Sequence, residues 1–181
     1  MTIPNYITLF RILLVPFFFT SLVSYEPGSE YYRWVAFGLF IAACLSDALD
    51  GILARVLNKH SELGRFLDPL ADKMLLLSGY LALLTASLKI TPPLWVIVTI
   101  VFRDIILISG LLILFLMTGN IRIKSNMLGK VTTAVQMITL GVILAQWKIA
   151  VPLWHIAGGV TIISCVVYVF RELNHLNGNA K

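Results

Sequence analysis

The sequence has little charge for its length, and this scarcity limits the classes of protein to which it can belong. Only 13% of its 181 residues are charged, whereas 59% are hydrophobic, and the mean hydropathy is +0.90. A soluble globular domain has about 25% charged and about 45–50% apolar residues. The composition therefore excludes a disordered chain, argues against a soluble enzyme, and predicts a single membrane domain over residues 1–181.

Patterns typical of several other protein classes are also missing. The two cysteines, Cys44 and Cys165, lie inside apolar stretches, which argues against a disulfide framework. The net charge is +5, but the basic residues form no continuous face, so we expect no nucleic-acid partner. No internal repeat, low-complexity segment or linker indicates a second domain.

Six long apolar runs account for most of the chain. They cover residues 7–23, 34–57, 66–88, 94–117, 127–147 and 151–170. A membrane-spanning helix needs about 20 predominantly apolar residues, so each run can cross a bilayer. Pro4 and Asn5 precede the first run and look like the start of a short interfacial helix. The predicted fold is all-α: six transmembrane helices preceded by a short interfacial N-terminal helix.

The basic residues in the loops predict the orientation of these helices. With a cytoplasmic N-terminus, the inner loops and the tail hold eight Lys and Arg residues, and the outer loops hold three. Lys and Arg accumulate in cytoplasmic loops. We therefore expect both termini to lie in the cytoplasm.

Four aspartates lie inside the second and third apolar runs, where charge is unfavourable. They are Asp47, Asp50, Asp68 and Asp72. A charge in a spanning helix costs about 2.5–3.5 kcal/mol on insertion scales, so these residues are functional candidates. Spacings of three and four residues place each pair on one helix face. The predicted orientation places all four near the cytoplasmic ends of two neighbouring helices.

Four carboxylates in one low-dielectric site repel one another strongly, so they either share protons or bind cations. Hard oxygen ligands favour Mg²⁺, Mn²⁺ or Ca²⁺, and no Cys or His lies at a spacing that suits zinc. Two divalent cations would neutralise the cluster and could clamp a phosphate ester. The alternative is a structural ion-pair network, which is disfavoured because the acids outnumber the nearby bases.

Small and basic residues accompany the aspartates. Gly51, Ala54 and Gly64 let a ligand or a neighbouring helix approach the backbone. Arg55 and Arg65 offer guanidinium groups that suit phosphate oxygens. Helix packing alone also explains the small residues, so both interpretations remain open from the sequence.

The segment from Asp47 to Asp72 reads D-x-x-D-G-x-x-A-R, eight residues, then G-x-x-x-D-x-x-x-D. This pattern resembles the signature of the CDP-alcohol phosphatidyltransferases at every fixed position, and the six-helix layout is similar too. The resemblance implies that a CDP-linked lipid, usually CDP-diacylglycerol, gives its phosphatidyl group to an alcohol and that CMP leaves. It also implies a homodimer in a bacterial-type inner membrane, with the active site facing the cytoplasm.

The same resemblance implies roles for individual residues. Two divalent cations, Mg²⁺ or Mn²⁺, would be held by Asp47, Asp50, Asp68 and Asp72. Asp72 would also be the general base that accepts the proton of the acceptor hydroxyl. The CDP moiety would be lined by Gly51, Ala54, Arg55 and Gly64.

Two basic residues in later runs are candidates for binding the acceptor. Arg103 and Lys130 would suit a phosphorylated alcohol such as glycerol 3-phosphate, if both face the cytoplasmic cavity. Alternatively, Arg103 forms an ion pair with a membrane acid such as Asp104, and Lys130 extends its side chain to the interface.

Local segments bear on the identity of the acceptor. Residues 129–136 are similar to the corresponding segment of bacterial phosphatidylglycerophosphate synthases, which use glycerol 3-phosphate. Those enzymes commonly have Arg-Glu and a later second arginine where this chain has Arg103-Asp104 and leucines. The Arg-Asp pair is also similar to cardiolipin synthases that use CDP-diacylglycerol and phosphatidylglycerol. We predict glycerol 3-phosphate as the acceptor, with phosphatidylglycerol as the alternative.

A hypothesis from another class is a non-catalytic membrane scaffold or a small transporter, because intramembrane acids also mark ion pathways. Six helices without a visible repeat do not favour a transporter.

Overall fold

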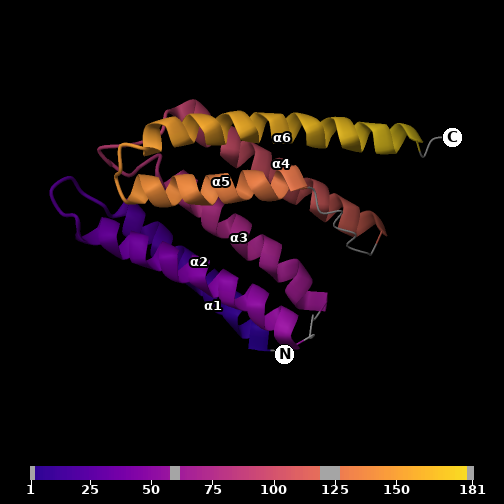
Figure 1. Cartoon of the computed structure of the whole chain (residues 1–181), viewed down its shortest axis with the longest axis horizontal. Helices are drawn as coiled ribbons and strands as arrows, with labels where there is room; N and C mark the ends of the chain where they lie inside the picture. Colours follow the sequence, from indigo (N-terminus) through magenta and orange to yellow (C-terminus); the bar gives the residue numbers. More distant parts are fainter. Residues whose placement is uncertain (1–2, 58–61, 119–126, 179–181) are drawn as a thin grey trace. The chain divides into compact units, whose positions relative to one another are not determined.

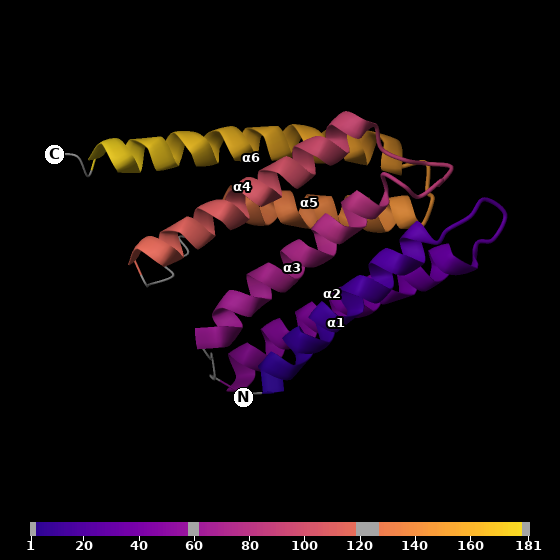
Figure 2. The same ribbon diagram turned by 180° about the vertical axis from the view of Figure 1, so that it is seen from behind.

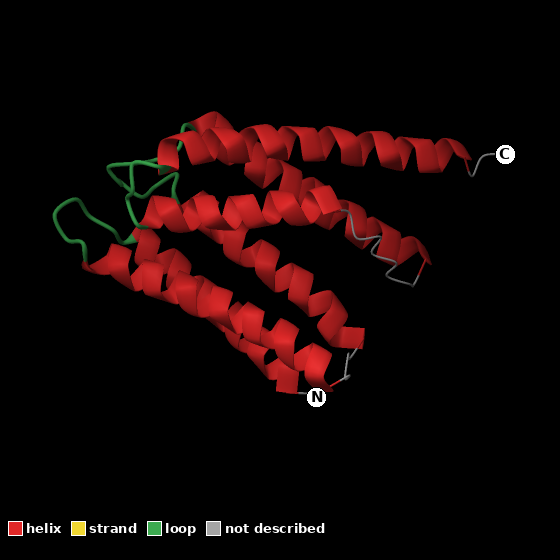
Figure 3. Cartoon of the chain, viewed as in Figure 1, coloured by secondary structure: helices red, strands yellow, loops and turns green. Residues whose placement is uncertain are grey.

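Six α-helices make up the described part of the chain in the computed structural model, which covers residues 3–57, 62–118 and 127–178 (Figures 1 and 3). Side chains are described for residues 8–49, 71–110 and 127–170. The helices are α1 (Ile3–Val23), α2 (Tyr31–Leu57), α3 (Glu62–Ala82), α4 (Leu94–Thr118), α5 (Met127–Leu144) and α6 (Ala150–Gly178). No strand occurs within these ranges, and the predicted all-α class is confirmed.

Three of the helices are long and apolar enough to cross a membrane. The qualifying segments, among the residues described, are Tyr31–Leu49 of α2, Met127–Leu144 of α5 and Ala150–Phe170 of α6. A shorter apolar stretch, Thr8–Val23, lies in α1. The six-span topology and the cytoplasmic position of both termini remain predictions.

The N-terminal segment differs from the sequence-based prediction. Instead of a separate interfacial helix followed by a span, α1 runs without a break from Ile3 to Val23. Pro4 and Asn5 lie in its first turn. A proline is tolerated there because the amides of the first turn have no hydrogen-bond partner within the helix. The prediction of a separate helix was wrong because neither a glycine nor a further proline interrupts the chain before Pro16.

The chain forms two compact units, and each is described by itself. The first unit comprises Met1–Thr91 and Leu140–Lys148, and the second comprises Pro92–Thr139 and Ile149–Lys181. The unit boundary falls within α5, so its first turns belong to the second unit and its last turns to the first. The single domain predicted for residues 1–181 remains a prediction.

In the first unit, α1 packs against both α2 and α3, and the three ribbons run side by side in both views (Figures 1 and 2). The buried Phe18 of α1 and Phe40 of α2 place their ring centroids 6.0 Å apart. Gly79 of α3 is required for close approach, because a Cβ atom there would lie 2.5 Å from Leu140 Cδ2. Helix α1 is thus the central packing partner of the two helices that carry the aspartates.

Two polar clamps close the end of the first unit where α2 begins. Arg33 donates through Nη1 to the carbonyl oxygen of Leu144 at 2.7 Å and through Nε to Glu30. Gln146 accepts from the Ile90 amide at 2.9 Å and donates to the Ile90 carbonyl at 3.1 Å. These bonds tie the ends of α2 and α5 and the loop after α3 together without using any residue of the predicted site.

In the second unit, α4 packs against α6. Gly158 of α6 permits this contact, because a Cβ atom there would lie 2.8 Å from Cζ3 of Trp95. The Trp95 ring also stacks on His155, with ring centroids 5.8 Å apart.

Candidate functional site

The described part of the acidic site is centred on Arg11 of α1. Its Nη1 atom lies 2.9 Å from Asp47 Oδ1 on α2 and 2.7 Å from Asp72 Oδ1 on α3. The Arg11 side chain is 1% exposed, whereas those of Asp47 and Asp72 are 41% and 27% exposed. Three helices therefore meet at one buried guanidinium whose acidic partners remain accessible.

The packing of α1 explains why these three residues meet. Ala43 of α2 lies one helical turn before Asp47, and Ala71 of α3 directly precedes Asp72; both alanines are fully buried. Such small side chains let neighbouring helices approach closely. A long arginine side chain on the central helix can then reach acids on both neighbours.

The remaining motif residues lie on the same two helices, but their side chains are outside the described residues. Asp50, Gly51, Ala54 and Arg55 fall within α2. Gly64, Arg65 and Asp68 fall within α3. Their predicted roles in holding cations and CDP remain predictions, while the first and last aspartates of the motif are shown to lie together.

The two described carboxylates suit a divalent cation. Oδ1 of Asp47 and Oδ1 of Asp72 come from different helices and both approach Arg11 Nη1. The fold therefore places two carboxylate oxygens close enough to surround one positive charge. Mg²⁺ and Mn²⁺ favour such hard oxygen ligands, commonly one or two carboxylates together with substrate phosphates. The donor set therefore fits the cations that the sequence pattern implies.

Sequence reasoning missed Arg11 as a functional residue, although a signal was present. Arg11 is the only charged residue in the run 7–23, and an isolated charge in an apolar helix requires a partner. The sequence did not reveal which acids are its partners, because that depends on how α1 packs against α2 and α3.

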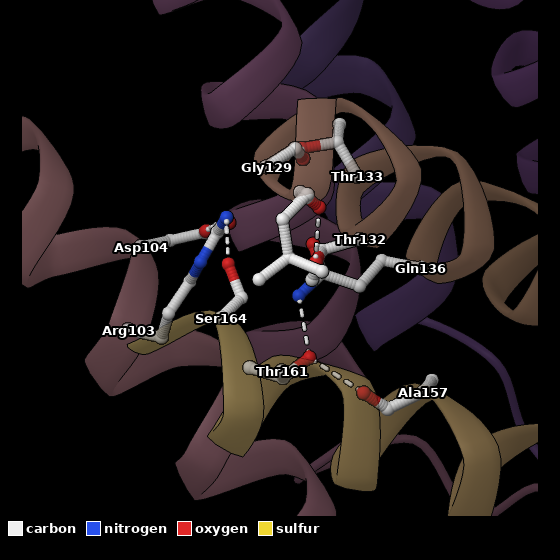
Figure 4. Close-up of polar contacts among 10 residues, drawn as sticks. Arg103, Asp104, Gly129, Thr132, Thr133, Gln136, Ala157, Thr161 and Ser164 are labelled. Atoms are coloured by element: carbon white, nitrogen blue, oxygen red, sulfur yellow. Dashed lines mark hydrogen bonds and ion pairs between the residues drawn. The ribbon is translucent and has the colours of Figure 1, made fainter. Parts of the chain in front are cut away.

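The second unit holds a different buried arginine. Arg103 Nη1 donates to Asp104 Oδ1 at 2.7 Å, and its Nη2 donates to Ser164 Oγ of α6 at 3.1 Å (Figure 4). The side chains of Arg103 and Asp104 are only 3% and 1% exposed. The ion pair with Asp104, which the sequence left open as an alternative, is therefore present.

Lys130 is exposed in the first turn of α5. The neighbouring Gly129 passes close to the buried arginine, because a Cβ atom there would lie 3.6 Å from Arg103 Nη2 (Figure 4). The predicted role of Arg103 and Lys130 in binding the acceptor phosphate remains a prediction.

Further polar side chains link α5 to α6 inside the second unit. Gln136 donates to Thr161 Oγ1 at 3.0 Å, and Thr161 donates to the carbonyl of Ala157 at 2.6 Å (Figure 4). Buried polar groups are stable when they are hydrogen-bonded, so this layer fixes the packing of the two helices.

Comparison with known proteins identifies a family over most of the chain. A family model described as CDP-alcohol phosphatidyltransferase matches residues 1–170. The chain is 35% identical over 151 residues to the CDP-diacylglycerol–glycerol-3-phosphate 3-phosphatidyltransferase of Bacillus subtilis, covering 78% of this chain and 76% of that protein.

Two further relatives represent the two acceptor predictions. A probable phosphatidylglycerophosphate synthase of Mycobacterium tuberculosis is 35% identical over 185 residues, covering 96% of this chain and 83% of that protein. A cardiolipin synthase (CMP-forming) of Rattus norvegicus is 35% identical over 160 residues, covering 80% of this chain and 50% of that protein.

Proposed function

The chain belongs to the CDP-alcohol phosphatidyltransferase family, and we propose that it transfers the phosphatidyl group of CDP-diacylglycerol to glycerol 3-phosphate, releasing CMP. The observation that carries this proposal is the convergence of Asp47 and Asp72 from two helices on one buried guanidinium. These two residues are the first and last acids of the motif, so the contact of both with Arg11 supports one site formed from both helices.

The family and the three apolar helices indicate an integral membrane protein. The positive charge of the predicted inner loops supports placing both termini and the site on the cytoplasmic side, and the bacterial-type inner membrane is proposed from the family resemblance. A homodimer belongs to the same proposal and rests on the family resemblance alone.

The four aspartates are proposed to hold two divalent cations, Mg²⁺ or Mn²⁺. Asp47 and Asp72 are the two members of this set that are described, and both are partly exposed. Cations bound there would stabilise the negative charge that develops on the diphosphate and on the leaving CMP. Gly51, Ala54, Arg55 and Gly64 are proposed to line the CDP moiety.

Asp72 is proposed to be the general base. Its carboxylate would accept the proton of the acceptor hydroxyl while the hydroxyl oxygen forms a bond to the phosphorus of the phosphatidyl group. The bond from that phosphorus to the CMP oxygen then breaks, and CMP leaves. The exposure of Asp72, at 27% of its side chain, supports this role, because the base must be accessible to the acceptor hydroxyl.

The acceptor is proposed to be glycerol 3-phosphate, with Lys130 and Arg103 as ligands of its phosphate. Lys130 is exposed on α5 and can offer its ammonium group to a phosphate. The names of the Bacillus subtilis and Mycobacterium tuberculosis relatives support this acceptor. Each of their alignments covers more than three quarters of this chain.

A second acceptor, phosphatidylglycerol, is favoured by one observation. Arg103 already pairs with the buried Asp104 and with Ser164, so its positive charge is partly satisfied within the protein. A phosphatidylglycerol acceptor would rely less on such a cation, because its acyl chains supply much of the binding. This reaction would make the chain a cardiolipin synthase.

Identification of the lipid product separates these two reactions. Purified protein in nanodiscs containing CDP-diacylglycerol would receive Mg²⁺ and either glycerol 3-phosphate or phosphatidylglycerol, and the lipids would be analysed by mass spectrometry. We expect phosphatidylglycerophosphate in the first sample and no cardiolipin in the second. Cardiolipin as the sole product would replace the main proposal with the second, and no CMP release with either acceptor would contradict both and leave the scaffold or transporter hypothesis.

A further inference from the structure

The contacts of Arg11 indicate how the repulsion between the carboxylates of Asp47 and Asp72 is balanced when no cation is bound. This inference rests on the proposed cation site. We propose that Arg11 is an internal counter-ion: it holds Asp47 and Asp72 together when no divalent cation is bound, and it competes with the cation for their oxygen atoms. Arg11 is therefore a positioning residue that sets both the stability of the cation-free site and its affinity for cations.

The geometry shows why a counter-ion is needed. Asp47 and Asp72 lie on different helices and both approach the same Arg11 nitrogen, at 2.9 and 2.7 Å. Two carboxylates this close repel each other in the absence of positive charge. Because α1 packs against both α2 and α3, repulsion between the acids would act directly on the packing of the first unit.

The burial of Arg11 distinguishes it from a surface ion-pair partner. Its side chain is 1% exposed, so it has little access to water and depends on its partners in the protein, the two acids among them, for its stability. The acids are 41% and 27% exposed, which leaves them accessible to an arriving cation. The two acids can therefore bind a cation in place of Arg11. Arg11 itself cannot leave the site without placing its charge in the apolar core.

The charge balance indicates what Arg11 contributes once cations are bound. Two divalent cations would just neutralise the four carboxylates of the motif. Arg11 then adds one surplus positive charge beside the site, which favours an anionic diphosphate substrate and opposes the cations. A cation must consequently bind less tightly in the presence of Arg11 than in its absence.

Substitution by methionine tests both consequences, because methionine keeps much of the length of arginine and removes its charge. In a chelator, Arg11→Met should unfold at a lower temperature than the wild type, since the acids have lost their counter-ion. Mn²⁺ should then raise its unfolding temperature by more than it raises that of the wild type. The affinity for Mn²⁺ should rise about ten-fold, the effect of about one charge-assisted interaction.

A matched control is available in the same unit. Arg33 is also buried and also pairs with an acid, Glu30, but it lies at the beginning of α2 and contacts neither Asp47 nor Asp72. Arg33→Met should lower the unfolding temperature equally with and without Mn²⁺, and its affinity for Mn²⁺ should match that of the wild type. Arg11→Lys serves as the conservative variant and should fall between the wild type and Arg11→Met.

The measurements are thermal unfolding in detergent, in chelator and in Mn²⁺, and Mn²⁺ binding followed by the EPR signal of the free ion. The inference is supported if only the Arg11 variants show a larger Mn²⁺-induced stabilisation and tighter Mn²⁺ binding. It is overturned if Arg11→Met loses the same stability in both conditions and binds Mn²⁺ as the wild type does. If Arg11→Met does not fold, the same criterion applies to Arg11→Gln, which also removes the positive charge but keeps a polar side chain.

The wild type distinguishes failure of this inference from failure of the proposed function. A wild type that binds Mn²⁺, together with Arg11 variants that bind it no more tightly, overturns the counter-ion role alone. A wild type that shows neither binding nor stabilisation by Mn²⁺ overturns the cation site and the counter-ion role together.

Discussion

Arg11 and Arg103 are both buried arginines in apolar helices, but their acidic partners differ. Arg11 contacts two aspartates on two other helices, and these acids are 41% and 27% exposed. Arg103 contacts the adjacent Asp104, which is 1% exposed, and Ser164. The exposure of the partner acids, more than the buried charge itself, therefore distinguishes acids that a cation can reach from acids enclosed in the protein.

The largest effect is expected at the open site. Asp72→Asn should lower kcat by about 10²- to 10⁴-fold, the usual contribution of a general base, while the KM for CDP-diacylglycerol changes little. Steady-state assays of CMP release measure both quantities. A loss of donor affinity in proportion to the loss of activity would instead make Asp72 chiefly a ligand and place the base elsewhere.

Loss of the buried ion pair between Arg103 and Asp104 should reduce the stability of the protein. Asp104→Asn leaves the buried Arg103 beside a neutral side chain, which should lower the free energy of unfolding by about 3 kcal/mol. Thermal unfolding in detergent measures the loss, and Mn²⁺ should not reverse it. The matched variant Asp47→Asn should lose less stability but most of the stabilisation by Mn²⁺. If both variants responded to Mn²⁺ in the same way, the distinction between the two sites would be lost.

Lys130 tests whether α5 contributes to binding the acceptor. Lys130→Ala should raise the KM for glycerol 3-phosphate by about 10-fold or more, because one charge-assisted contact contributes about 1.5–3 kcal/mol. The KM for CDP-diacylglycerol should stay nearly constant. Lys148→Ala, which also removes an exposed lysine, is the control and should leave both values unchanged. An unchanged acceptor KM in Lys130→Ala would favour phosphatidylglycerol as the acceptor.

The smallest effect concerns the third buried arginine, Arg33, whose acidic partner Glu30 has a side chain that is 43% exposed. The hydrogen bond from Arg33 lowers the pKa of Glu30 below its ordinary value of 4.5. Because the pKa is lower in the folded state, Glu30 stabilises the fold above pH 4.5 and loses that contribution as the pH falls through the lowered value. Glu30→Gln should therefore reduce the loss of stability between pH 5 and 3 in thermal unfolding experiments, whereas the activity at pH 7 should equal that of the wild type.

The helices were largely predictable from the sequence, because apolar runs and membrane helices have similar lengths. The run 94–117 corresponds closely to α4 at Leu94–Thr118. The run 66–88 was placed too late, because α3 begins at Glu62 among polar residues and ends at Ala82. Apolar character continues past that end, but hydrogen-bonded turns replace the helix at Leu83, so hydropathy alone could not locate it.

The candidate site was predictable in its acids but not in its central cation. The spacing of Asp47 and Asp72 within the motif was enough to predict that they belong to one site, and the structure confirms that they lie together. The contact between Arg11 and both acids depends on the packing of α1 against two helices, which no spacing along the chain encodes. The partner of Arg103 was one of the alternatives open from the sequence, and only the structure identified Asp104.

The anomalous scattering of Mn²⁺ in a crystal of the protein grown with that ion would show whether the open acidic site binds the cation. We expect anomalous peaks within coordination distance of Asp47 and Asp72, and none beside Asp104. Peaks at Asp104, or none at Asp47 and Asp72 with the cation at saturating concentration, would contradict the assignment of the open acidic site as the cation site.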